Sequence, residues 1–184
     1  MATRNLIAID FSHRRLRAIE AVAHRGGIKL LRSLSEEVPG EIAHEDVSAL
    51  GRWIGRRLRQ RGFTAENAIL SVNREHAVTR RLTLPTTKPD EFPSMVSLSL
   101  KKDLPIDSDQ AVIDFIEFQR HETSSEVLAC AIPRDVLARV VEVAEAAGLN
   151  VTAVSLRCFG TAKLLGSLPE NQGRNALAID LGAG

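Results

Sequence analysis

Two short segments, one near each end of this chain, share a pattern that constrains its fold more than any other feature. Residues 7 to 10 read Ile-Ala-Ile-Asp and precede a turn, and residues 178 to 184 read Ala-Ile-Asp-Leu-Gly-Ala-Gly. Each pattern predicts an apolar strand that carries an acid, Asp10 or Asp180, to its C-terminal end just before a tight loop. We therefore expect an α/β fold in which these two acids meet at neighbouring strand ends.

The first 75 residues predict three antiparallel strands, a helix and a fourth strand. Turn signals separate the strands, and apolar residues three to four positions apart indicate an amphipathic helix that ends before Gly62. The fourth strand follows this helical crossover and should run parallel to an earlier one. The predicted elements are strands over 6–10, 16–23, 28–38 and 67–72 and a helix over 45–61.

Residues 76–155 predict a separate compact unit with the element order βαββαβ. Its predicted strands are 76–84, 111–119, 127–132 and 150–155, and its predicted helices are 90–102 and 133–147. Asp90 is expected to cap the first of these helices, and Gly148 to end the second. A last helix over 158–168 then leads to the strand 176–180, which carries Asp180.

A pair of facing strand ends of this kind suits a phosphate tail bound with Mg²⁺. Carboxylates hold the hydrated cation, and backbone N–H groups in a glycine loop approach the phosphate oxygens. Taken alone, an apolar strand that ends in aspartate is more often an ordinary strand end than a ligand site. The pair, with a separate unit between its two members, favours the functional interpretation.

These features resemble the actin, Hsp70 and sugar kinase superfamily, and within it the PilM proteins of type IV pilus assembly and their FtsA relatives. The supporting segments are Leu82 to Pro85, Glu91 to Pro105, Asp114-Phe115, Val127 to Pro133 and Ala146 to Leu149. The resemblance covers essentially the whole chain and implies a ribonuclease H-like, actin-type ATPase lobe. Residues 1–75 and 156–184 would form this lobe, subdomain 1A, and residues 76–155 an inserted α+β subdomain, 1C.

The resemblance also implies ATP and Mg²⁺ as cofactors of a full-length protein. The implied cofactor-binding residues are Asp10, Ser12, His13, Arg14, Asp180 and Gly182, and Asp10 and Asp180 would hold Mg²⁺ through water. The first loop departs from the family pattern, because Ser12 replaces the glycine that permits close backbone approach. His13 and Arg14 replace small hydroxyls, and an arginine there either pairs with phosphate or fills the pocket. The sequence leaves ATP binding open.

The chain ends within the second predicted phosphate loop, whereas the superfamily places the adenosine site further along. We therefore expect an N-terminal fragment that binds nucleotide poorly and does not transfer phosphoryl groups, since that chemistry needs an enclosed cleft. For a full-length protein we expect a weak ATPase at most. No catalytic residue is assigned, because no Ser-His-Asp or Cys-His arrangement can be assembled from the sequence spacing.

Composition favours a partner that is recognised locally. The formal net charge is +1, so no global field attracts nucleic acid or an anionic membrane. We interpret the arginines of the predicted helix 45–61 as a solvated face rather than a nucleic-acid patch. Cys130 and Cys158 are interpreted as reduced, and no segment approaches the roughly 18 apolar residues of a membrane span. We expect the chain in the cytoplasm.

By resemblance, the expected function is that of a scaffold for a type IV pilus or related secretion platform. It would bind the cytoplasmic tail of a PilN-like membrane protein, which would hold it at the periphery of the inner membrane. Self-association stays open, and no nucleic-acid partner is expected. Two alternatives remain. One is a nucleotide-free scaffold like the cytoplasmic part of a type II secretion L protein, and the other is a fragment of a sugar-kinase-like phosphotransferase that uses Asp10 and Asp180.

Overall fold

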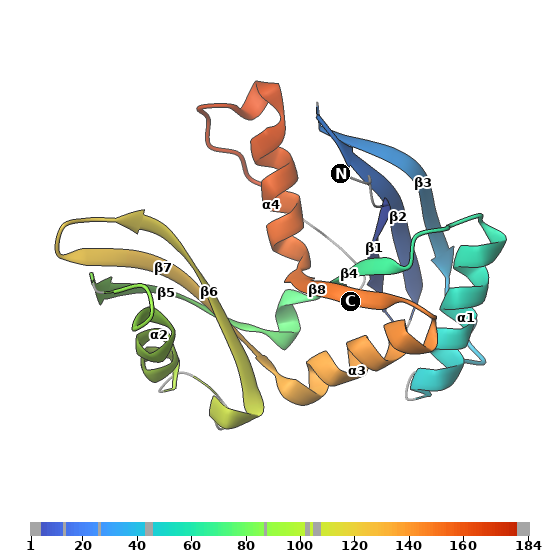
Figure 1. Ribbon diagram of the computed structural model, residues 1–184, viewed down its shortest axis with the longest axis horizontal. Coiled ribbons are helices and arrows are strands. Elements are labelled where there is room, and N and C mark those ends of the chain that lie inside the picture. The colour runs from blue at the N-terminus through green and yellow to red at the C-terminus, as the bar shows by residue number, and fades with distance from the viewer. Residues whose placement is uncertain are drawn as a thin grey trace. The chain divides into compact units, whose positions relative to one another are not determined.

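The structure is a computed structural model that describes residues 5–12, 14–25, 27–42, 46–86, 88–101, 104 and 108–179. It divides the chain into two compact units, whose elements are labelled in Figure 1. The first unit comprises Met1–Asn73 and Val141–Gly184, and the second comprises Arg74–Val140. Each unit is built around its own β-sheet.

The first unit contains a five-stranded sheet with the strand order β3-β2-β1-β4-β8. Its strands are β1 (Asn5–Phe11), β2 (Arg15–His24), β3 (Gly27–Glu37), β4 (Asn67–Val72) and β8 (Asn150–Leu156). β1, β2 and β3 are antiparallel neighbours, whereas β4 runs parallel to β1. The predicted opening of three strands, a helix and a fourth strand is therefore confirmed.

Helix α1 (Val47–Gln60) connects β3 to β4 and buries one apolar stripe. Leu50, Ile54 and Leu58 lie on one side of the helix because their spacing is close to the helical repeat, and all three are buried. Gly62 follows the helix with a φ of 76°, a left-handed conformation that glycine adopts without strain. The predicted stop at Gly62 is therefore confirmed.

Arg57 of α1 and Arg61, which caps its C-terminal end, join the helix to the strand β3. Arg57 Nε donates to Glu36 Oε2 at 2.6 Å, and Arg61 forms a second ion pair with the same carboxylate. The hydrogen bond from Arg57 is the main reason that the pKa of Glu36 lies below its ordinary value. The other arginines of the helix, Arg52, Arg56 and Arg59, are exposed.

Glu20 of β2 is a fully buried carboxylate. Its oxygens accept hydrogen bonds from Asn5 Nδ2 at 3.1 Å, Thr64 Oγ1 at 2.9 Å, Ala65 N at 3.1 Å and Arg32 Nη1 at 3.0 Å. Burial raises the pKa of Glu20, but the hydrogen bonds from Thr64 and Asn5 and the charge of Arg32 outweigh it and hold the pKa below its ordinary value. One carboxylate thus joins β1, β3 and the segment between α1 and β4.

We expect the stability of the first unit to fall in acid, partly because of Glu20. Its pKa is lower in the folded than in the unfolded chain, so it contributes stability above its ordinary pKa of 4.5 and loses that contribution as the pH falls through the folded value. Urea unfolding midpoints measured from about pH 7 to about pH 3 should fall for the native chain. They should fall less steeply for Glu20→Gln, which does not titrate, and equal slopes would contradict this role of Glu20.

The second unit contains a three-stranded antiparallel sheet, in the order β5-β7-β6, and a covering helix. Its elements are β5 (Val78–Pro85), α2 (Phe92–Leu100), β6 (Ala111–Arg120) and β7 (Ser124–Pro133). Phe92, Val96 and Leu100 of α2 pack into a buried core with residues of the sheet. Phe92 also stacks on Phe115 of β6, with ring centroids 6.0 Å apart. The helix therefore closes one face of this sheet.

The predicted cap of the first helix in this unit is wrong. Asp90 was expected at the N-cap, but α2 begins after Glu91, and Glu91 makes no side-chain capping bond. The helix instead has a proline in its first turn, whose fixed φ angle already suits a helix start. Within the described residues, short 3₁₀ turns also lie at Arg74–His76, Ser108–Gln110 and Pro169–Asn171.

The predicted boundary of the inserted unit at residue 155 is also wrong. Helix α3 (Arg134–Ala146) leads out of the second unit, and the strand that follows it, β8, pairs in parallel with β4 in the first sheet. Asn150 Nδ2 donates to Asn67 Oδ1 at 2.8 Å, and Thr152 Oγ1 donates to the carbonyl of Ala68 at 3.0 Å. These partners lie on β4, so the inserted unit spans Arg74–Val140 instead of 76–155.

The predicted strand over 176–180 is not found in the described residues. Helix α4 (Arg157–Ser167) occupies nearly the predicted range, but residues 176–179 after it form no strand, and Asp180 lies outside the described residues. The side chains of Leu177 and Ile179 are 85% and 73% exposed. An apolar segment forms a strand only beside a neighbour that takes up its backbone hydrogen bonds. None of the helices described is both long and apolar enough to cross a membrane.

Candidate functional site

Asp10 lies where the parallel strands of the first unit end. Its register partner on β4 is Ser71, and Ser71 in turn pairs with Ser155 on β8. The C-terminal ends of β1, β4 and β8 therefore lie in one row, with Arg157 starting α4 just after β8. Ligands of α/β proteins commonly bind at this edge of a sheet, so the edge is the natural place to look for a site.

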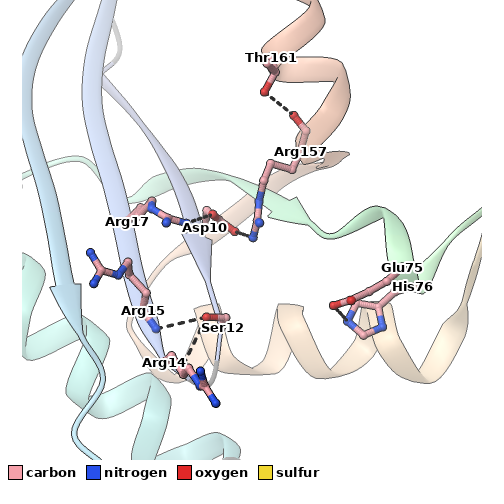
Figure 2. A network of polar contacts seen from close by, with 9 residues as sticks. All are labelled: Asp10, Ser12, Arg14, Arg15, Arg17, Glu75, His76, Arg157 and Thr161. Carbon is pink, nitrogen blue, oxygen red and sulfur yellow. Dashed lines mark hydrogen bonds and ion pairs between the residues drawn. The ribbon is translucent and has the colours of Figure 1, made fainter. Parts of the chain in front are cut away.

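Two arginines bind the Asp10 carboxylate, as Figure 2 shows. Arg157 Nη2 donates to Oδ1 at 2.7 Å, and Arg17 Nη1 approaches Oδ2 at 3.4 Å. The side chain of Asp10 is 16% exposed and that of Arg157 is 29% exposed, so the shorter pair is partly shielded from water. Thr161 Oγ1 also donates to the carbonyl of Arg157, inside the first turns of α4. The carboxylate thus holds the start of α4 to the end of β1.

The turn between β1 and β2 is closed by hydrogen bonds of its own. Ser12 N donates to the carbonyl of Arg15 at 2.9 Å. The Ser12 hydroxyl oxygen accepts from Arg14 N at 3.3 Å and from Arg15 N at 3.2 Å (Figure 2). This serine therefore does not open the loop as a glycine would. It takes up two backbone N–H groups of the turn.

The structure places half of the sequence-predicted site residues in one turn. Asp10, Ser12 and Arg14 lie together at the end of β1 and just beyond it. The predicted residues His13, Asp180 and Gly182 lie outside the described residues. The expected meeting of Asp10 with Asp180 at neighbouring strand ends therefore remains a prediction.

Sequence reasoning missed both arginine partners of Asp10. Arg17 stands directly across from Asp10 in the antiparallel register of β1 and β2, and that register follows from the hairpin. Arg157 is 147 positions away in the chain and lies two residues after the end of the predicted strand 150–155. Its position after a strand was a usable signal, but only if that strand had been assigned to the same sheet as Asp10.

A second candidate site is an apolar pocket within the second unit. It has a volume of about 270 Å³ and lies between the start of β5 and the start of α3. Its lining residues are Glu75, His76, Ala77, Val78, Leu104, Ala111, Ala131, Pro133 and Val136. His76 Nε2 lies 3.6 Å from Glu75 Oε1, a contact also seen in Figure 2. The pocket has the size and chemistry for an apolar side chain.

The described residues offer no metal centre made of side chains alone. Across these ranges, no group of three or more His, Cys, Asp or Glu residues is placed to hold a metal ion. Neither Cys130 nor Cys158 takes part in a disulfide bond.

Comparison with known protein families identifies the chain. The family model described as type IV pilus assembly protein PilM matches residues 8–184. The chain belongs to the PilM family. Among curated proteins, no sequence matches it significantly.

Two solved structures share the fold of this chain. A PilM-PilN type IV pilus biogenesis complex matches with a TM-score of 0.79 and 18% identity, covering 90% of this chain and 52% of that one. The cytoplasmic domain of EpsL, an inner membrane component of the type II secretion system of Vibrio cholerae, matches with a TM-score of 0.52 and 13% identity. That match covers 82% of this chain and 56% of the other. The predicted α/β fold is confirmed.

This member of the PilM family spans about half the length of the solved structures it matches. At 18% and 13% identity, the matches establish the arrangement of helices and strands but transfer no individual site residue. The roles of Asp10 and of the apolar pocket must therefore be argued from the contacts of this chain.

Proposed function

We propose that this PilM family member is a non-enzymatic scaffold of type IV pilus assembly that binds the cytoplasmic tail of a PilN-like membrane protein. It would lie in the cytoplasm and be held at the inner membrane by that partner. The observation that carries the proposal is the match of the PilM family model to residues 8–184. The fold match to a PilM-PilN complex supports the choice of partner.

The apolar pocket of the second unit is the part of this chain best suited to receive the tail. An extended tail gains affinity from backbone pairing and specificity from pockets for alternate side chains. Val78, Val136 and Pro133 give this pocket an apolar lining, so a leucine-sized or phenylalanine-sized side chain would lose water on entering it. We propose that one apolar side chain of the tail occupies this pocket.

The test uses the complete protein and a fluorescent peptide of the cytoplasmic tail of the PilN-like protein from the same organism. Fluorescence anisotropy should show saturable binding to the native protein. Val136→Glu places a charge in the pocket and should weaken binding about tenfold or more, since burying one such apolar side chain contributes about 1.5–3 kcal/mol. Circular dichroism must show that the variant keeps its fold.

Ala138→Glu is the matched control. Ala138 lies on the same helix as Val136 but is exposed and does not line the pocket. This variant should bind the peptide within about twofold of the native protein, because exposed substitutions rarely change free energies by more than about 0.5 kcal/mol. If both variants bound the peptide equally well, the pocket would be rejected as the binding site, but the scaffold proposal would stand. Absence of binding by the native complete protein would reject the scaffold proposal itself.

The type II secretion alternative has weaker support. The EpsL cytoplasmic domain shares the fold at a TM-score of 0.52, but the family model that matches the chain is that of PilM. Binding of the labelled tail by the native protein, with no binding of the corresponding peptide from a type II secretion protein, would support the pilus assignment.

A further inference from the structure

A protein that binds a nucleotide with Mg²⁺ needs two kinds of group near the phosphates, and neither may already be occupied by contacts within the protein. A carboxylate must offer lone pairs to the cation or to its bound water, and backbone N–H groups must point at the phosphate oxygens. The end of β1 is where the resemblance to actin-like proteins places both. The contacts of Asp10 and Ser12 therefore test whether this chain fits such a ligand.

The Asp10 carboxylate is already engaged on both oxygens. Arg157 binds Oδ1 at 2.7 Å and Arg17 approaches Oδ2 at 3.4 Å, so two cationic groups surround one anion. A Mg²⁺ ion placed here would face two guanidinium groups of like charge. The local charge therefore disfavours a second cation at this carboxylate.

The backbone of the turn is engaged as well. The N–H groups of Arg14 and Arg15 donate to the Ser12 hydroxyl, and Ser12 N donates to the carbonyl of Arg15. A phosphate could claim these donors only by breaking the bonds that close the turn. The N–H donors that the structure describes in this turn, those of Ser12, Arg14 and Arg15, are thus engaged within the chain.

The guanidinium of Arg157 is engaged with Asp10 through one of its nitrogens, Nη2. Its Nε is buried and has no hydrogen-bond partner among the described residues, whereas Nη2 binds Asp10. If the guanidinium swung away to a ligand, the largely buried Asp10 carboxylate would lose its nearest partner. The ion pair therefore favours a fixed arrangement at the start of α4.

We infer that Asp10 in this chain is an ion-pair anchor and not a magnesium-nucleotide ligand. It fixes the first residue of α4 to the ends of β1 and β2, and the scaffold keeps this arrangement without a nucleotide at this edge of the sheet. The inference does not depend on the PilN-like partner, because it rests only on contacts within the first unit.

A double-mutant cycle on the 184-residue chain tests the anchor. Asp10→Asn and Arg157→Gln should each lower the thermal unfolding midpoint by about 2–4 °C, as expected for a partly buried pair in a chain of this size. The double variant should lie near the single variants, because either substitution removes the same interaction. If Asp10 instead served to bind a cation, the opposite result is expected: Asp10→Asn would leave the unfolding midpoint unchanged or raise it.

The pair formed by Arg15 and Glu37 is the matched control. These side chains are 42% and 81% exposed, and they pair across the neighbouring strands β2 and β3 at 3.2 Å. Arg15→Gln and Glu37→Gln should change the midpoint by about 2 °C or less, since exposed pairs contribute little. Additive effects in the Asp10 and Arg157 cycle, or control shifts as large as the test shifts, would overturn the inference.

Calorimetry on the complete protein provides the second readout. The heat and affinity measured on titration with ATP should be the same with and without Mg²⁺. They should also be the same for Asp10→Asn as for the native protein. Nucleotide that binds away from Asp10, without needing Mg²⁺, is consistent with this expectation. Binding that requires Mg²⁺ and is lost in Asp10→Asn would overturn the inference, and it would leave the PilN-like partner proposal standing, because the peptide experiment measures that separately.

Discussion

Glu20→Ala is expected to lower the free energy of unfolding by about 3–5 kcal/mol. The substitution removes the acceptor for the side chains of Asn5 and Thr64 and for the backbone N–H of Ala65. These donors are partly buried, and each one left without a partner costs up to roughly 1–3 kcal/mol. The cavity left by the side chain adds to this loss. Urea unfolding followed by circular dichroism measures the effect.

Glu37→Ala is the control for this prediction. Glu37 is also a glutamate of the hairpin and also pairs with an arginine, but its side chain is 81% exposed. Its replacement should change the free energy of unfolding by at most about 1 kcal/mol. If Glu20→Ala were as mild as Glu37→Ala, the buried carboxylate would not be joining β1, β3 and the segment after α1 as the hydrogen bonds indicate.

The elements of the first unit were predictable because their signals are local. Strand β4 spans Asn67–Val72, the predicted range, since its apolar run stands between a helix end and a polar turn. The antiparallel hairpins followed from turn residues and from alternating apolar positions. Register within a hairpin is then fixed by the turn, so the pairing of Asp10 with Arg17 was within reach of the sequence.

The sheet to which β8 belongs was not predictable from such signals. Residues 150–155 have the pattern of a strand in either sheet, and the helix before them suggested a return to the nearest strands. The contacts that accompany the pairing of β8 with β4 join residues distant in sequence. One is the hydrogen bond between Asn150 and Asn67, which are 83 positions apart. Local pattern thus predicts that a strand exists, while its neighbour is chosen by tertiary contacts.

The sequence predicted where the acid of the candidate site lies, but it did not predict which side chains surround that acid. An acid at the end of the first strand was correctly placed, because the strand itself was correct. The shorter of its two arginine contacts comes from Arg157, which reaches it only because β8 lies in the same sheet. The error over β8 therefore concealed the contact that most changes the interpretation of Asp10.

Gly55→Ala is expected to lower the free energy of unfolding by about 1–2 kcal/mol, although alanine is the better helix former. A Cβ atom at Gly55 would lie 2.3 Å from the carbonyl oxygen of Ala147 and 3.0 Å from its Cα. These are backbone atoms, so no side chain can rotate aside, and α1 must move away from the segment after α3. Overpacking of this kind costs about 1–3 kcal/mol or more, against about 1 kcal/mol gained in helix propensity.

Gly160→Ala in α4 tests the same substitution without the close approach. A Cβ at Gly160 would meet nothing within 4 Å, so only the helix propensity changes and the chain should gain about 0.5–1 kcal/mol. The two variants should therefore shift the urea midpoint in opposite directions. If both raised it, α1 and Ala147 would have to lie further apart than the structure has them. If both lowered it, the loss at Gly55 would not be specific to this contact, because Gly160 has no neighbour with which to clash.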